Sequence, residues 1–405
     1  MAEIEPSAAG FDATRLKRLD RYLDGCVERD LNKGSIVMVA RHGKLVHVSR
    51  RGLRDAEARL PVEMDTIWRL YSMTKPVTSV ALLTLWEEGL LSLSDPVEEY
   101  IPSFANMTIL GADSPPDSRV PATEPIRISH LLTHTAGLTV TGMADNAVDA
   151  AYRRAGIAAL AQPEDYTLAE LCERLAALPL LFEPGSAYNY SHATDVLGRV
   201  IEVVSGTSLD QFMQQRIFDP LRMPDTGFRI PERDRLSALY LRKATTGDTL
   251  RLPDFEEPAG ELPTLVAGGH GLMSTAPDYY RFAQMLAHGG ELDGQRVLSP
   301  RTVASIAANH LPGGALLSEF THPPTRTGAH LQGRGFGFGV TPLLDPVGIN
   351  SLSSLGEYGW GGAAGTNFWI DPQADLVVLF MMHVIPPPEA LWVALRNLVY
   401  QALVE

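Results

Sequence analysis

The sequence has little cysteine and no long apolar run. Its two cysteines, Cys26 and Cys172, lie far apart and each falls in a helix-like apolar pattern, so we expect buried thiols in preference to a disulfide. The longest apolar stretch, from Leu376 to Ile385, is interrupted by His383 and is too short to span a bilayer. We therefore expect no membrane-spanning segment.

Positive charge is also scarce. The formal net charge is -14, only five of the 34 basic residues are lysines, and no run rich in Lys or Arg occurs. Because a negative chain is repelled by phosphate backbones, nucleic acid is not an expected partner. The segment from Met1 to Pro6 lacks a basic stretch followed by an apolar run. We expect no signal peptide and, unless a leader has been removed, a cytoplasmic protein.

Strand patterns lie near both ends of the chain. Residues 36–39 and 45–48 are rich in β-branched side chains and flank His42 and Gly43, which predicts an antiparallel hairpin. Two further strands are predicted at 366–370 and 376–383. Helical periodicity is predicted for residues 11–31, 72–88, 166–178, 195–204, 208–218 and 277–288, and for a last helix that starts at 386–388.

The middle of the chain is mostly helical. We therefore predict an α/β domain, made of residues 1–80 and 230–405, whose antiparallel sheet is joined by the N- and C-terminal helices. Residues 81–229 are predicted to form an inserted all-α domain, with a loop rich in Pro and Asp at 111–125. Two glycine-rich segments, 267–275 and 356–365, are predicted as turns.

Ser72 and Lys75 lie three residues apart where a helical pattern begins. At this spacing both side chains lie on one helix face, so the amine can come within hydrogen-bond reach of the hydroxyl. A serine hydroxyl attacks acyl carbons when a neighbouring group takes its proton, and a lysine does this once desolvation favours its neutral amine. The structural alternative is a helix-capping Ser72 and a solvated Lys75.

Residues 184–195 form a Pro-Gly turn that leads to Tyr190 just before a helix. A tyrosine hydroxyl next to an ammonium group is stabilised as the phenolate and can share proton transfer with Lys75. Tyr188 is a competing candidate two residues away. For either residue the alternative is a ring packed in the core.

Residues 359–365 read Gly-Trp-Gly-Gly-Ala-Ala-Gly. They match a dinucleotide-binding pattern at Gly359, Gly361 and Ala364, but a strand and not a helix follows, which argues against that function. A glycine-rich strand edge can instead bring a backbone N-H close to a ligand and form half of an oxyanion hole. The alternative is a tight turn with a buried Trp360.

Three motifs, Ser72-Met-Thr-Lys75, Tyr190-Ser-His192 and Trp360-Gly-Gly362, occur in this order. Together they resemble the serine β-lactamase and penicillin-binding superfamily. The likeness is greatest to class C β-lactamases and to the family VIII carboxylesterases that share their fold, and phrases at 128–138, 220–226 and 269–275 support it. The resemblance covers nearly the whole chain and implies a serine β-lactamase-like fold, an antiparallel sheet flanked by helices with an inserted helical lobe.

The resemblance implies that Ser72 is the nucleophile, Lys75 its base partner, and Tyr190 the proton shuttle for acylation and deacylation. It also implies an oxyanion hole and a substrate-binding wall, formed by the N-H groups of Ser72 and Ala363 and by Trp360, Gly361, Gly362 and His192. No metal or cofactor is implied.

Two departures from the superfamily narrow the expected substrate. His192 replaces the asparagine of the usual Tyr-x-Asn motif, an amide suited to a substrate's acylamino group. Trp360 stands where the usual motif has a cation that binds a β-lactam or peptide carboxylate. Both changes favour neutral, short acyl esters as small-molecule substrates, so we expect a serine carboxylesterase with weak β-lactamase activity.

Several alternatives stay open at the level of sequence. They are an acyltransferase, a β-lactamase or peptidase of the same fold, and a non-catalytic acyl-ligand sensor or scaffold. The residues do not indicate an oligomeric state. The Gly-x-Ser-x-Gly elbow of another esterase fold is absent.

The sequence also contains a histidine pair with the spacing of a metal site. His130 and His134 are four residues apart and could grip a metal from one helix face. Because no third ligand stands at the expected spacing, we expect a structural pair bonded to loop carbonyls. For His192, we expect either an influence on Tyr190 or a supporting or surface role.

Overall fold

The computed structural model describes residues 3–110, 115, 118–141, 146–157, 165–229, 232–252, 261–322, 331–388 and 390–404. Part of the predicted loop at 111–125 lies outside these residues. None of the helices in these ranges is both long and apolar enough to cross a membrane.

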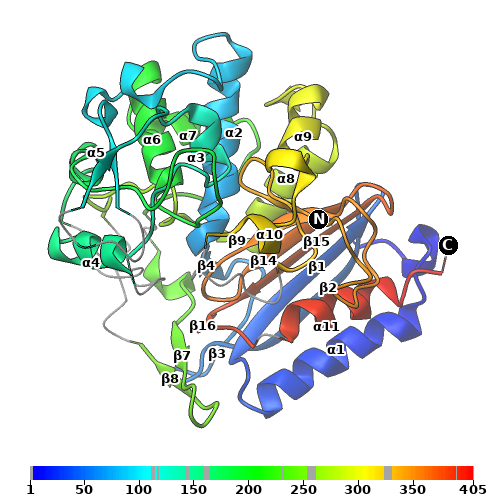
Figure 1. Ribbon diagram of the computed structural model, residues 1–405. Coiled ribbons are helices and arrows are strands. Elements are labelled where there is room, and N and C mark those ends of the chain that lie inside the picture. Colours follow the sequence, from blue (N-terminus) through cyan, green and yellow to red (C-terminus); the bar gives the residue numbers. More distant parts are fainter. Residues whose placement is uncertain are drawn as a thin grey trace.

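A seven-stranded antiparallel sheet is the largest sheet among the described residues (Figure 1). Its order is β12-β13-β14-β15-β1-β2-β3, so strands from the C-terminal part lie beside strands from the N-terminal part. The predicted sheet, closed by both ends of the chain, is confirmed. Its strands are β1 Gly34–Arg41, β2 Lys44–Asp55, β3 Leu60–Pro61, β12 Thr341–Pro342, β13 Tyr358–Gly361, β14 Asn367–Asp371 and β15 Leu376–Met382.

The predicted hairpin is formed by β1 and β2. His42 and Gly43 at its turn have φ values of 54° and 68°, the left-handed conformation that a tight hairpin turn requires. The prediction that 356–365 is entirely a turn is wrong, because residues 358–361 form β13. A side chain at Gly359 would collide with the carbonyl of Phe368 on β14, so glycine allows these two strands to approach.

Helices cover both faces of the sheet (Figure 1). The helices α1 (Ala13–Glu28) and α11 (Leu391–Tyr400) share one apolar core with Val37 and Val39 of β1. Ile36 and Met38 face the other core, which includes α8 (Ala276–Ala287). Since β15 lies between the two cores, all of its residues are buried, which explains its uninterrupted apolar run.

Most predicted helix ends agree with the structure to within a few residues. Asp12 caps α1 as predicted, through bonds from the N-H groups of Thr14 and Arg15. The final helix begins at Leu391, later than the predicted start at 386–388, and the short strand β16, Val384–Ile385, precedes it beside β7. Cys26 and Cys172 are buried and unpaired, as predicted.

The helix α2 (Thr74–Glu87) packs against α6 and α7 of the helical part (Figure 1). Every residue from Thr74 to Leu85 is buried, not only the predicted stripe. The other helices of this part are α3 Ile128–Leu132, α4 Ala147–Arg154, α5 Leu168–Ala176, α6 Ala193–Ser205 and α7 Leu209–Met213, with a π-helical turn at Gln214–Phe218. The domain boundaries at 80/81 and 229/230 stay a prediction.

The remaining elements are short. They are the strands β4 Ile67–Arg69, β5 Thr108–Ile109, β6 Val120–Pro121, β7 Tyr240–Arg242, β8 Thr249–Arg251, β9 Met273–Thr275, β10 Glu291–Leu292 and β11 Gln295–Arg296, and the helices α9 Pro300–Ile306 and α10 Leu317–Phe320. The strand β4, which precedes Ser72, pairs antiparallel with β9. The prediction that 267–275 is entirely a turn is therefore wrong at its last three residues.

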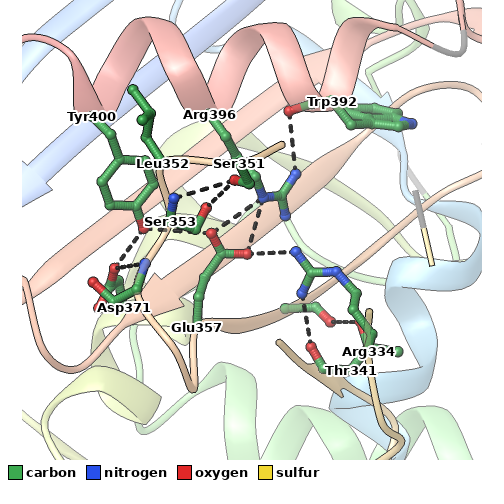
Figure 2. A network of polar contacts seen from close by, with 12 residues as sticks. Arg334, Thr341, Ser351, Leu352, Ser353, Glu357, Asp371, Trp392, Arg396 and Tyr400 are labelled. Carbon is green, nitrogen blue, oxygen red and sulfur yellow. Dashed lines mark hydrogen bonds and ion pairs between the residues drawn. The ribbon is translucent and has the colours of Figure 1, made fainter. Parts of the chain in front are cut away.

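A buried polar network fixes the start of β13 to α11 (Figure 2). Glu357 accepts hydrogen bonds from Nη2 of Arg334 at 2.8 Å and from Nε of Arg396 at 2.9 Å. The hydroxyl of Tyr400 donates to Oδ2 of Asp371 at 2.6 Å. Burial alone raises the pKa of Glu357, but the guanidinium groups of Arg396 and Arg334 lower it to about 2.

Replacing Glu357 with glutamine is expected to lower the free energy of unfolding by about 3–5 kcal/mol, because two guanidinium groups then stay buried without a counter-charge. The wild-type carboxyl has a pKa of about 2 in the folded chain against an ordinary 4.5. Its contribution is therefore present above pH 4.5 and is lost as the pH falls through 2. Urea unfolding at several pH values measures both effects.

The matched control is E63Q. Glu63 pairs with Arg50 at 2.7 Å, but both side chains are nearly half exposed, so the same substitution is expected to cost less than about 1 kcal/mol. Equal losses in E357Q and E63Q would contradict a special role for the buried network.

Candidate active site

Ser72 lies at a sharp change of direction in the chain. It follows β4 and sits in a 3-10 turn, Tyr71–Met73, directly before α2. Tyr71 has a φ of 48°, a left-handed conformation that is rare for a side chain of its size and sets the direction in which Ser72 points. Ser72 is 9% exposed, and Pro76 falls in the first turn of α2, as predicted.

The hydroxyl of Tyr190 forms a hydrogen bond with Oγ of Ser72, at 2.6 Å between the two oxygens. These residues are 118 positions apart in the chain. Asn189 fixes the segment before α6, because its Nδ2 donates to the carbonyl of Leu138 at 2.9 Å. The fold therefore brings together the serine and the phenol that the sequence predicted as partners.

The competing candidate, Tyr188, faces the core. It is 2% exposed, its ring packs against those of His134 and Phe336, and its hydroxyl has no hydrogen-bond partner among the described residues. Burial raises the pKa of Tyr188 well above its ordinary value. The choice between the two tyrosines therefore falls on Tyr190.

Lys75 is 5% exposed, so the alternative of a solvated lysine is wrong. Its Nζ donates to the carbonyl of Gly269 at 2.7 Å and lies 4.5 Å from the centre of the Tyr190 ring. The three-residue spacing predicts that the amine lies beside the Ser72 hydroxyl. Among the described residues, Lys75 instead forms a hydrogen bond with Gly269, and the group that forms a hydrogen bond with Ser72 is the phenol of Tyr190.

The turn after β13 lies against the segment that carries Ser72. A side chain at Gly362 would collide with the carbonyl of Leu70, so only glycine permits this approach. The N-H of Gly365 donates to the carbonyl of Gly362 at 2.9 Å and closes the turn. The N-H of Ala363 takes no part in this hydrogen bond. Ala363 packs in a small apolar cluster with Tyr71, next to Ser72.

Trp360 and Phe336 form an apolar wall beside the phenol. The Trp360 ring lies 6.0 Å from that of Tyr190 and 5.6 Å from that of Phe336, measured between ring centres. A side chain at Gly361 would lie 2.9 Å from Nδ2 of Asn367, so this position is also closely packed. No sequence signal pointed to Phe336.

His192 is buried at 4% exposure, so a surface role is wrong. Its Nδ1 lies 2.8 Å from Oδ2 of Asp195, and its Nε2 has no hydrogen-bond partner within the described ranges. A contact between His192 and substrate stays a prediction.

Asp195 is a buried residue of the site that the sequence argument missed. Burial alone raises its pKa, but the hydrogen bond from His192 and the charges of His192, His270 and Lys75 hold that pKa below its ordinary value. The only sequence signal was an acidic residue in the first turn of a predicted helix, which is common at helix starts.

The histidine pair does not share a helix face. The helix α3 ends at Leu132, and His134 beyond it has a φ of 55°. His130 accepts from the N-H of Arg127 at 3.2 Å, and His134 bonds the hydroxyl of Ser191 at 3.1 Å, so the predicted loop carbonyls are not their partners. In the part of the chain that the structure describes, no group of three or more His, Cys, Asp or Glu side chains could hold a metal ion.

Known proteins resemble this chain over most of its length. Residues 19–399 match the Beta-lactamase family. Esterase EstB of Burkholderia gladioli is 31% identical over 98% of this chain and 99% of its own, and Protein Rv1367c of Mycobacterium tuberculosis is 36% identical over 88% and 87%. The solved structure of EstCE1, described as a hydrolase with promiscuous acyltransferase activity, has a TM-score of 0.78 and 28% identity, and the match covers 98% of this chain and 99% of that one.

Proposed function

The chain belongs to the beta-lactamase family, and on this premise we propose that it is a carboxylesterase that cleaves short acyl esters through an acyl-enzyme on Ser72. Its family and its esterase relative support the broader class, a serine hydrolase of the β-lactamase fold. The observation that carries the narrower proposal is the 2.6 Å bond between Tyr190 and Ser72, with Lys75 buried against the phenol ring.

In the proposed acylation step, Oγ of Ser72 attacks the ester carbonyl while its proton passes to the phenolate of Tyr190. The ammonium of Lys75, 4.5 Å from the ring centre, stabilises the negative charge on that phenolate. When the carbon-oxygen bond of the ester breaks, Tyr190 gives the proton to the departing alcohol. The Ser72 ester is left as the intermediate.

Two backbone N-H groups are proposed to bind the oxyanion that forms during attack. They belong to Ser72, at the start of the helical region, and to Ala363, in the turn held against Leu70 by Gly362. In deacylation, water attacks the acyl carbon and gives its proton to Tyr190. The bond between that carbon and Oγ of Ser72 then breaks, Tyr190 returns the proton to Ser72, and the free acid leaves. The same groups therefore serve both halves of the reaction.

The apolar wall of Trp360 and Phe336 supports a neutral acyl group as substrate. Trp360, which is 8% exposed, lies beside the ring of Tyr190 and packs against the fully buried Phe336, and position 360 offers no cation for a carboxylate. Short, uncharged acyl chains fit this setting better than peptides or β-lactams. Turnover of a chromogenic cephalosporin is expected to be weak.

Acyl transfer is the second candidate. EstCE1 is described as a hydrolase with promiscuous acyltransferase activity, and an alcohol can replace water in the second step without a change in the catalytic groups. The ratio of transfer product to free acid, measured with p-nitrophenyl butyrate and an added alcohol, distinguishes the two activities.

The proposal is tested by covalent labelling. The protein is treated with a fluorophosphonate, its intact mass is measured, and the modified residue is mapped by peptide sequencing. We expect one adduct, on Ser72, that forms at the rate at which hydrolysis of p-nitrophenyl butyrate is lost. An adduct on another serine, or hydrolysis that continues in fully labelled protein, would overturn the proposal. An ester-derived adduct that never turns over would support an acyl-ligand sensor instead.

A further inference from the structure

We propose that Asp195 is a positioning residue for Lys75 and that it acts through Gly269. The inference rests on the proposed function, because it gives Lys75 a part in ester cleavage. Nothing in the sequence motifs assigned a role to Asp195 or to the glycine segment at 267–271.

The first half of the connection runs from α6 to the glycine segment. Asp195 is 3% exposed and lies in the first turn of α6. Its Oδ1 accepts the N-H of Gly269 at 2.7 Å, and its Oδ2 lies 2.8 Å from Nδ1 of His192. Both carboxylate oxygens are therefore fixed, one by the backbone and one by a buried imidazole.

The second half runs from the glycine segment to α2. The carbonyl of Gly269 accepts from Nζ of Lys75 at 2.7 Å, and the carbonyl of Gly268 accepts from Oγ1 of Thr78 at 2.6 Å. The segment thus lies between α2 and α6 and is hydrogen-bonded to both. One residue, Gly269, is held by Asp195 through its N-H and holds Lys75 through its carbonyl.

The absence of a side chain at Gly269 is part of this arrangement. A Cβ there would lie 3.0 and 3.2 Å from the two oxygens of Asp195 and 3.2 Å from Nζ of Lys75. The carboxylate and the amine therefore face the same small space, which a methyl group would fill. At Gly268 a Cβ would collide with the carbonyl of Thr194, so the segment needs glycine to approach α6 at all.

This geometry gives Asp195 two effects on Lys75. It fixes the carbonyl that orients Nζ toward the Tyr190 ring, and it supplies a negative charge close to an amine that is 5% exposed. A buried positive charge is costly unless an opposite charge compensates it. His192 and His270 are the other titratable groups beside the carboxylate. Among the described residues, Asp195 forms no hydrogen bond with Ser72 or Tyr190. Its effect on the reaction is therefore indirect.

The test compares kcat and KM for p-nitrophenyl butyrate in wild type, D195N and D195A. In D195N the amide oxygen still accepts the N-H of Gly269, but the charge is gone. We expect kcat to fall roughly 100-fold, the typical cost of a misplaced catalytic group, while KM changes less than about twofold. D195A is expected to fall further, because the N-H of Gly269 also loses its acceptor.

Two further variants separate positioning from stability. D278N makes the same change at a carboxylate that is 5% exposed in the first turn of α8 and accepts the N-H of Asp225 at 2.7 Å. Its kcat is expected to stay near that of wild type. G269A keeps the charges of Asp195 and Lys75 but places a methyl group between them, so its kcat is expected to fall. This variant tests the proposal even if the Asp195 variants do not fold.

Wild-type kcat in D195N, a rise in KM with unchanged kcat, or an equal loss in D278N would each overturn the inference. S72A is measured in parallel. Hydrolysis that survives in S72A would defeat the proposed function, whereas hydrolysis that depends on Ser72 but not on Asp195 or Gly269 would defeat only the inference.

Discussion

Replacing Ser72 with alanine is expected to lower kcat/KM for p-nitrophenyl butyrate by about 10⁴- to 10⁶-fold. Its Oγ is the atom that forms the acyl bond, and its removal leaves the Tyr190 hydroxyl without the partner that it has at 2.6 Å. Without this atom, no acyl-enzyme can form at position 72. Steady-state hydrolysis, corrected for the spontaneous rate, measures the loss.

A matched control lies on the same helix. Ser79 of α2 is 1% exposed, so S79A makes the same chemical change in an equally buried position. Its activity is expected to stay within about twofold of wild type, because Ser79 has no part in the proposed chemistry. Activity above roughly one per cent of wild type in S72A would mean that another group forms the acyl bond.

The second large effect is expected for Tyr190→Phe. The ring remains beside Trp360 and Lys75, but the phenolate oxygen that takes the Ser72 proton in the proposed mechanism is gone. General acid–base groups of this kind contribute about 10²- to 10⁴-fold, so we expect kcat to fall by that factor with little change in KM. Labelling of Ser72 by a fluorophosphonate is expected to slow in parallel.

Tyr188→Phe is the control for this variant. Tyr188 is buried two residues away and its hydroxyl has no partner among the described residues, so its loss is expected to leave both activity and stability close to wild type. A larger loss of activity in Y188F than in Y190F would show that the wrong phenol has been assigned to proton transfer.

Much of the fold follows from local sequence. The hairpin of β1 and β2 is predicted from β-branched residues on both sides of His42 and Gly43. The helix α1 is predicted from the capping residue Asp12 and the apolar stripe that follows it. Such signals involve residues only a few positions apart, so they can be recognised without knowing how the rest of the chain folds. The same is true of Ser72 and Lys75, whose spacing pointed to nucleophilic chemistry.

Other features of the site could not be predicted locally. The segment 356–365 looked like a turn because it is rich in glycine, but the close approach of β14 makes part of it a strand. His130 and His134 have the spacing of one helix face, yet α3 ends between them. In each case a tertiary contact or a change in backbone direction overrode the local pattern.

The sequence by itself determined the residue types of the site, the strands at both ends of the chain and the helical middle. Only the tertiary structure decided that the phenol of Tyr190 bonds Ser72 and that Lys75 bonds Gly269, which are 118 and 194 positions away from their partners. It also decided that Asp195 faces the amine. Spacing and periodicity report neighbours within a helix or strand, whereas these contacts depend on how α2, α6 and the glycine segment pack against one another.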